Sequence, residues 1–265
     1  MVMFVPLVSV SLRFAKEVTA YADEEHIVLT RLSPTTLNGD CYRVLKAAIL
    51  DLTLGPGTPI VENTVAVQLG TSKTPVREAL ARLTSEGLIV TDRSRRSYVA
   101  GLSIDSVREI YAVRAMLESA SVRRVASHVT DANLVEIEAS INRASQALDD
   151  EDLSAFLDAN DAFHMHLIAC SHNRYLIGMA ERIFDQVRRV RAALYRAEPS
   201  VDRHAFSRRG LENHRAILRA LTARDPDRSA ELMASDVEMF VDLMDTPTVQ
   251  DALLRLSDLT VARNL

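Results

Sequence analysis

The chain has 265 residues with a formal net charge of −5, and 48% of its residues are hydrophobic. These values are typical of a globular protein long enough for two compact units, while 8 Gly, 8 Pro and no Trp argue against a β-sandwich or a low-complexity chain. The two cysteines, Cys41 and Cys170, are too few for a disulfide framework and too far apart for a CxxC metal site, so we expect a reducing cytoplasm.

The first 34 residues show no sustained periodicity. Their apolar start, MVMFVPLVSV, has no basic residue before it and is interrupted by Pro6, which argues against a secretory signal. We expect residues 1–34 to be a poorly ordered extension, or to follow from a start codon placed too far upstream. No apolar run approaches the roughly 20 residues that a membrane span needs, so no membrane partner is expected.

Residues 35–102 have the pattern of a winged helix-turn-helix. Apolar residues recur at helical spacing over residues 42–52, and LGPGTPI then breaks that helix. A second helix is expected over residues 62–69, and a third carries Pro75 in its first turn and ends at Gly87. The following LIVTDRSRRSYVAGL predicts two short strands around a basic turn.

The third helix is a candidate for reading DNA. Such a helix lies in the major groove, where hydroxyl groups and the helix N-terminus suit phosphate oxygens and Lys or Arg reaches phosphate or guanine. Residues 37–100 hold eight Lys or Arg and six Asp or Glu, so this segment is net +2 and the rest of the chain is −7. An ordinary solvated helix face is the alternative interpretation. The candidate contacts are Thr71, Ser72, Lys73, Thr74 and Arg77 on the helix, and Arg93, Arg95 and Arg96 on the wing.

The segments LGTSKTPVREAL and LTSEGLIV resemble the GntR family of bacterial transcriptional repressors. The resemblance implies that Lys73 and Arg77 contact double-stranded operator DNA. Family members usually have Arg at the position of Lys73, and Lys cannot make the same bidentate contact with guanine. Asn63 and Ser97 stand where the family has a basic residue and a wing-tip Gly, so we expect an operator that differs from the family consensus.

After Leu102 the chain has little Gly or Pro and long amphipathic segments, which predicts an all-helical bundle. The expected fold is therefore mainly α, with a winged helix-turn-helix over residues 35–102, a helical domain over 103–246 and a C-terminal helix or tail over 247–265. The expected helices cover residues 104–128, 131–149, 152–171, 174–197, 204–223, 226–244 and 248–260.

Polar side chains interrupt the apolar rows of three of these helices. Asn160 and His164 lie one turn apart on one row, and His214 and Asp236 stand on two others. A buried imidazole or carboxylate costs several kcal/mol unless it is paired or bound to a metal. Two His, one carboxylate and an amide oxygen suit a divalent cation such as Zn²⁺, Ni²⁺, Mn²⁺ or Fe²⁺. A hydrogen-bonded core network without metal explains the rows equally well.

Several arginines also stand out in this half of the chain. Arg114 lies on an apolar row and needs an anion, which is either Glu118 one turn later or the carboxylate of a bound ligand. A run of three further arginines is expected on a solvated or subunit-facing surface, or near the mouth of a pocket. The run consists of Arg188, Arg189 and Arg191.

The segments VRAMLE, NDAFHMHLIACSHNRYL and LENHRAILRAL resemble the FadR-type subfamily of GntR regulators, whose all-helical FCD domain binds ligands. The resemblance implies a metal held by Asn160, His164, His214 and Asp236. Asp236 stands where the family usually has His, and Asn160 stands where it often has Asp. Asp161, on a different face of the same helix as Asn160, is an alternative ligand.

The expected function is that of a homodimeric transcriptional regulator, a repressor that a small carboxylate effector releases from operator DNA. In this interpretation Arg114 and the metal bind the effector. One alternative keeps the fold without metal and binds an acyl-CoA or another larger ligand. A metal-dependent hydrolase is the other alternative, but the chain has no HExxH and no recognisable Ser/His/Asp or Cys/His signature, so no enzyme is expected.

Overall fold

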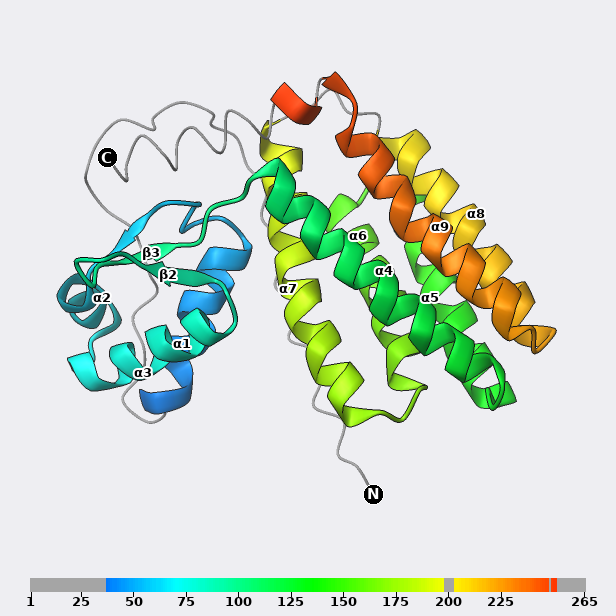
Figure 1. Cartoon of the computed structure of the whole chain (residues 1–265), viewed down its shortest axis with the longest axis horizontal. Helices are drawn as coiled ribbons and strands as arrows, with labels where there is room; N and C mark the ends of the chain where they lie inside the picture. Colours follow the sequence, from blue (N-terminus) through cyan, green and yellow to red (C-terminus); the bar gives the residue numbers. More distant parts are fainter. Residues whose placement is uncertain (1–36, 198–202, 248, 252–265) are drawn as a thin grey trace.

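The computed structural model describes residues 37–197, 203–247 and 249–251 (Figure 1). A small N-terminal part with a three-stranded sheet lies beside a bundle of long helices, and the stretch between β3 (Ser97–Val99) and α4 (Ile104–Ala126) joins the two. This arrangement confirms the predicted fold class. The expected extension over residues 1–34 lies outside the described residues, as does most of the expected helix over residues 248–260.

The N-terminal part is built from three helices around one apolar core. These are α1 (Leu37–Leu50), α2 (Glu62–Leu69) and α3 (Lys73–Ser85). Gly70 closes α2 with a φ of 68°, and Gly87 follows α3 with a φ of 72°, a left-handed conformation that favours glycine. The buried side chains include Leu45, Ile49, Leu69, Val76 and Leu83.

The sheet has the strand order β1-β3-β2, with β2 (Ile89–Thr91) antiparallel to β3. The sequence pattern predicts only the two strands around the basic turn. The structure adds β1 (Pro59–Ile60) inside the stretch that was expected only to break the first helix. Pro59 pairs with Tyr98 at the edge of the sheet, where a residue without an N–H is tolerated.

The six helices of the second half agree with the predicted ranges to within about two residues at each end. Side chains cap several of their first turns. Ser103 caps α4 and Thr130 caps α5 through capping boxes, and Asp225 caps α9 directly before a proline. The helices are α4, α5 (Asp131–Asp149), α6 (Leu153–Ala169), α7 (Arg174–Ala197), α8 (Arg203–Thr222) and α9 (Pro226–Met244).

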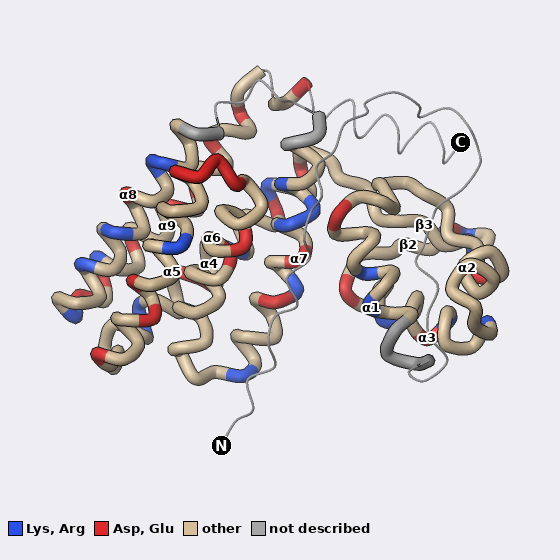
Figure 2. The backbone as a smooth tube through the Cα atoms, turned by 180° about the vertical axis from the view of Figure 1, so that it is seen from behind, with Lys and Arg blue, Asp and Glu red and all other residues tan. Residues whose placement is uncertain are grey.

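Helix α4 crosses the middle of the bundle and packs against α9 and α7, while α5 packs against α6 and α8 (Figure 1). Tyr111 of α4 stacks on Phe240 of α9 in the core, with ring centroids 4.4 Å apart. Seen from behind, α7 lies along the side of the bundle that faces α1 (Figure 2). Within the described part of the chain, no helix has both the length and the apolarity to cross a membrane.

Candidate metal centre, ligand pocket and DNA-reading surface

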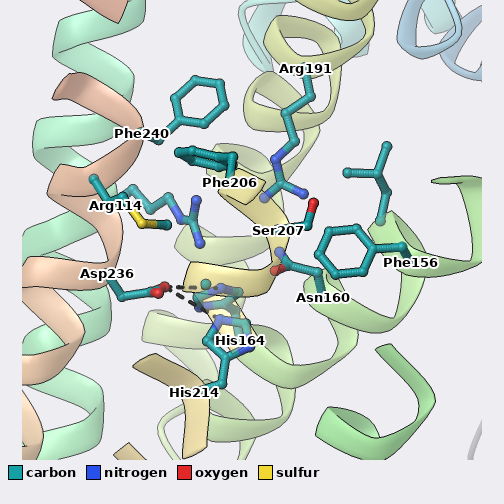
Figure 3. A pocket seen from close by; sticks show the side chains of 13 residues that line it. Arg114, Phe156, Asn160, His164, Arg191, Phe206, Ser207, His214, Asp236 and Phe240 are labelled. Carbon is teal, nitrogen blue, oxygen red and sulfur yellow. Dashed lines mark ion pairs between the residues drawn. The ribbon is translucent and has the colours of Figure 1, made fainter. Parts of the chain in front are cut away.

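Three helices of the bundle bring two imidazoles and one carboxylate together (Figure 3). The Nε2 atom of His164 on α6 lies 3.6 Å from Oδ2 of Asp236 on α9. The Nε2 atom of His214 on α8 lies 3.4 Å from the same oxygen. None of the three residues is more than 7% exposed. Three of the four side chains predicted as metal ligands are therefore neighbours in a buried cluster, called the His–His–Asp cluster below.

A hydrogen-bonded network and a metal site require different spacings in this cluster. N–H···O hydrogen bonds usually measure about 2.7–3.2 Å between heavy atoms, which is shorter than both distances. Two ligand atoms that each lie about 2.1 Å from one ion at a tetrahedral angle are about 3.4 Å apart. The ligand atoms of all three residues lie within 4.8 Å of one another. The spacing therefore fits a shared ion better than direct hydrogen bonds.

A carboxylate on the other side of His164 orients its ring. Oε2 of Glu118 lies 2.6 Å from Nδ1 of His164. Because an ionised carboxylate only accepts hydrogen bonds, we assign the proton to Nδ1, which leaves the lone pair of Nε2 directed at Asp236. The ring of His214 is held differently, since it stacks on Phe163 with centroids 3.9 Å apart. Both imidazoles are thus fixed with Nε2 towards the carboxylate.

The charge states around the cluster favour a cation. Burial lowers the pKa of His164, and the Glu118 carboxylate offsets only part of this effect, so the ring is neutral near pH 7. Burial works to raise the pKa of Asp236, but His214, His164 and Arg114 lower it to about 2. Oδ1 of Asp236 and Nδ1 of His214 are buried and have no hydrogen-bond partner within the described residues. The donor set suits Zn²⁺, Ni²⁺, Mn²⁺ or Fe²⁺.

The cluster lies at one end of a pocket whose other walls carry two guanidinium groups (Figure 3). Arg114 of α4 and Arg191 of α7 enter this pocket from different sides, and Asn160 and Ser207 lie on the Arg191 side. In this view Asn160 lies across the pocket from Asp236, and no distance assigns its amide to the cluster. The apolar walls consist of Phe156, Leu157, Phe206, Met239 and Phe240.

Arg114 has the local partner that its sequence position predicts. Its Nε donates a hydrogen bond to Oε1 of Glu118 at 2.5 Å, and the residue is 4% exposed. Its terminal nitrogens point into the pocket, so the pair with Glu118 leaves them directed at a ligand (Figure 3). Burial works to raise the pKa of Glu118, but Arg114 and His164 lower it to about 2, and the carboxylate is ionised. The sequence pattern identifies Glu118 only as a partner of Arg114; its contact with His164 is non-local and was missed.

The arginine run on α7 divides between the surface and the interior. The expected solvated surface holds for Arg188, whose side chain is 44% exposed, and is wrong for Arg189 and Arg191, while Arg191 lines the pocket, which was the alternative expectation. Arg189 is 1% exposed and donates to the carbonyl oxygen of Ala100. Arg191 is 6% exposed, and its Nη1 donates to Oδ1 of Asp161 at 2.7 Å. Nε of Arg188 lies 3.5 Å from Oδ2 of the same carboxylate. Asp161 is therefore an ion-pair partner of α7 rather than a member of the His–His–Asp cluster. The i, i+3 spacing of Arg188 and Arg191 is the signal that predicts their shared face.

The predicted DNA contacts occupy one end of the N-terminal part. The amino terminus of α3 and the turn between β2 and β3 both reach the end that is farthest from the helical bundle (Figure 1). Thr71 is partly exposed there. The exposed candidates are Ser72, Lys73, Thr74, Arg77, Arg93, Arg95 and Arg96. The fold thus gathers all eight predicted residues on one accessible surface, called the reading surface below.

Some arginines of the reading surface are held by carboxylates and some are not. Nε of Arg77 lies 2.7 Å from Oε2 of Glu62, and Nε of Arg96 lies 2.8 Å from Oδ2 of Asp92. Lys73, like Arg93 and Arg95 on the turn, has no ion-pair partner among the residues that the structure describes. Unpaired cations on an exposed surface suit phosphate oxygens, and a carboxylate-held arginine is oriented before it meets a base.

Helix α7 also contacts the N-terminal part. Nζ of Lys46 on α1 lies 2.5 Å from Oδ2 of Asp185 on α7 and 3.0 Å from Oε2 of Glu86. Nε2 of Gln186 donates to the carbonyl oxygen of Glu86 at 3.1 Å. With the Arg189 bond to the β3–α4 connection, these contacts hold the N-terminal part against the same helix that carries Arg191 into the pocket.

Comparisons with known proteins agree with both halves of the structure. The family model described as bacterial regulatory proteins, gntR family, matches residues 37–99, and the FCD domain model matches residues 109–239. The chain is 31% identical over 212 residues to the HTH-type transcriptional repressor RspR of Escherichia coli strain K12. The aligned region covers 80% of this chain and 90% of that protein. It is 30% identical to the regulator YdhC of Bacillus subtilis strain 168, over 64% of this chain and 79% of that one. The solved structure of E. coli McbR/YncC superposes with a TM-score of 0.66 at 25% identity, covering 79% of this chain and 97% of that chain.

Proposed function

The chain belongs to the GntR family of DNA-binding transcriptional regulators, with an FCD domain in its C-terminal half, and we propose that it is a metal-dependent repressor controlled by a small organic acid. One observation carries the proposal. The His–His–Asp cluster is buried, has the spacing of a metal site and lies at the end of a pocket that Arg114 enters.

The residues assigned to the metal are His164, His214 and Asp236. Asn160, the fourth predicted ligand, is assigned to the pocket wall on the Arg191 side. A bound divalent ion would supply a Lewis acid for a carboxylate of the effector. Arg114 is assigned to the same carboxylate, because its terminal nitrogens face the pocket and a guanidinium binds a carboxylate bidentately. Glu118 keeps His164 in the tautomer that presents Nε2 to the ion.

The reading surface is assigned to operator DNA, with α3 in the major groove and the β2–β3 turn against the backbone or minor groove. A homodimer would place two such helices about 34 Å apart on a roughly palindromic site. Exposed apolar side chains on α4 and α7 support association of two copies. They are Val113, Met116, Tyr175 and Met179, which are 38% to 68% exposed.

Helix α7 is assigned the role of coupling effector binding in the pocket to DNA affinity. It carries Arg191 in the pocket and, less than two turns away, Asp185 and Arg189 against the N-terminal part. A ligand changes DNA affinity only if it binds two arrangements of the reading domains with different affinity. Displacement of α7 in the pocket is a direct way to alter how the N-terminal part is held.

The test uses the full-length protein and a DNA fragment from upstream of its own gene. Metal analysis of wild type should find about one divalent ion per chain, and His164→Ala should lose it while His172→Asn, in an exposed turn, should retain it. Fluorescence anisotropy should show acid-induced release of DNA with metal and none after chelation. An acid response that survives chelation would overturn the metal site and favour a metal-free pocket for a larger ligand such as an acyl-CoA.

A further inference from the structure

The charges around the pocket favour an anionic effector. The buried charged side chains are Arg114 and Arg191 against Glu118, Asp161 and Asp236. Arg114 pairs with Glu118 and Arg191 pairs with Asp161, so these four charges cancel. With the two imidazoles acting as neutral ligands, a divalent ion outweighs the single charge of Asp236 and leaves the occupied site positive. Because a buried charge needs a partner, the occupied site favours a negatively charged ligand.

The two guanidinium groups that enter the pocket are separated in the way that a ligand with two acidic ends requires. Arg114 lies beside the His–His–Asp cluster, and Arg191 enters from α7 with Asn160 and Ser207 next to it (Figure 3). Both arginines are almost fully buried, at 4% and 6% exposed. Arg191 is close enough for its charge to work against the charge of Arg114 across the pocket. An anion between them would relieve that repulsion.

The walls between these polar ends are apolar, formed by aromatic and aliphatic side chains such as Phe156, Phe206 and Phe240. Hydrocarbon walls suit a short methylene chain between two acidic groups. A monocarboxylate would bind the metal end and leave Arg191, Asn160 and Ser207 facing an alkyl group. The amide and the hydroxyl would then lose the hydrogen bonds that water gives them.

We propose that the effector is a short-chain dicarboxylate, and that Arg191 is the residue that selects for its second carboxylate. One carboxylate lies at the metal and Arg114, and the other meets the guanidinium of Arg191 with the Asn160 amide and the Ser207 hydroxyl beside it. The proposal rests on the proposed function, because it places one of the two carboxylates at the metal ion. It also gives α7 a direct contact with the ligand.

The experiment is isothermal titration of metal-loaded full-length protein with matched acids. The probes are the dicarboxylates malonate, succinate, glutarate and adipate, each paired with the monocarboxylate of the same carbon number. At least one dicarboxylate should bind wild type about tenfold or more tightly than its monocarboxylate partner, since a hydrogen-bonded charge pair is added. Equal affinity for the two members of every pair would overturn the proposal.

Two variants assign the preference to Arg191. Arg191→Gln should reduce the ratio of dicarboxylate to monocarboxylate affinity to about one, while monocarboxylate affinity changes little. Arg191→Lys keeps a charge next to Asp161 and should retain part of the preference, which covers the case of a poorly folded glutamine variant. The matched control is Arg188→Gln, because Arg188 also pairs with Asp161 but its side chain is 44% exposed. A preference that survives in Arg191→Gln overturns the assignment.

The same titrations distinguish this proposal from the function on which it rests. If both members of a pair bind equally, and chelation abolishes both, the metal site stands and the dicarboxylate inference fails. If acids bind equally well with and without chelator, the metal site fails. If no acid binds, both proposals are overturned.

Discussion

The substitution Glu118→Gln tests whether a buried carboxylate prepares His164 for a metal ion. In the native structure Glu118 accepts two hydrogen bonds, from Nδ1 of His164 and from Nε of Arg114. Glutamine has one acceptor oxygen and one donor NH₂ group in the same place. If its oxygen faces Arg114, its NH₂ faces Nδ1 and forces the imidazole proton onto Nε2, which blocks ligation. If its oxygen faces His164, its NH₂ group faces the Nε–H of Arg114, and two hydrogen-bond donors then meet without an acceptor.

The expected loss follows from this conflict. Removal of the carboxylate partner of a metal-ligating histidine typically weakens metal affinity about 10- to 100-fold, which corresponds to about 1.4–2.7 kcal/mol. Glu118→Gln should also destabilise the fold by about 3–5 kcal/mol, because Arg114 is 4% exposed and loses its charged partner. Metal affinity therefore has to be measured on protein that circular dichroism shows to be folded.

The assay is competition for Zn²⁺ between the protein and a chromogenic chelator. The matched control is Glu109→Gln, which removes an exposed carboxylate from the same helix and should leave the affinity unchanged. Glu118→Asp keeps the charge on a shorter side chain and should fall between wild type and the glutamine variant. A folded Glu118→Gln protein with wild-type zinc affinity would refute the role of Glu118 in orienting His164.

Further predictions concern DNA, coupling and pH. Arg77→Ala should weaken operator binding, and if Arg77 contacts phosphate it should also lower the slope of log affinity against log salt concentration by about one. Arg123→Ala on α4 should change neither the affinity nor the slope. Fluorescence anisotropy at several salt concentrations measures the affinity and the slope. Asp185→Asn removes the Lys46 contact between α1 and α7, so acid binding should persist while acid-induced release of DNA is reduced; Glu181→Gln, exposed on the same helix, should leave the release intact. In metal-free protein, the lowered pKa of Glu118 contributes stability that is present above its ordinary value of 4.5 and lost as pH falls towards about 2. The difference in unfolding free energy between wild type and Glu118→Gln should therefore shrink over that range in urea titrations, and a constant difference would contradict the ionised pair.

The helices were predictable because their signals are local. Amphipathic spacing, capping residues such as Thr130 and the glycines that end α2 and follow α3 all act within a few residues of the boundary that they set. The strand β1 was not predictable in this way. It has two residues, and it exists because Pro59 and Ile60 pair with β3, which lies far along the chain.

The candidate metal centre shows the same division. His164, His214 and Asp236 were identifiable because each interrupts an apolar row on its own helix. Sequence spacing cannot show that Glu118 of α4 meets His164 of α6, because that contact depends on how the helices pack. The burial of Arg189 and Arg191 depends likewise on what lies against α7, and a run of arginines read alone indicates a surface.

The coupling between acid and DNA, measured with and without metal, tests the central claim most directly. Operator affinity of the metal-loaded protein is titrated by anisotropy in the absence and presence of the tightest-binding acid, and the pair of titrations is repeated after chelation. The acid should weaken DNA binding by at least about fivefold with metal, the lower end of typical allosteric coupling, and should have no effect without metal. An equal shift in both conditions would contradict a metal-dependent effector site at His164, His214 and Asp236.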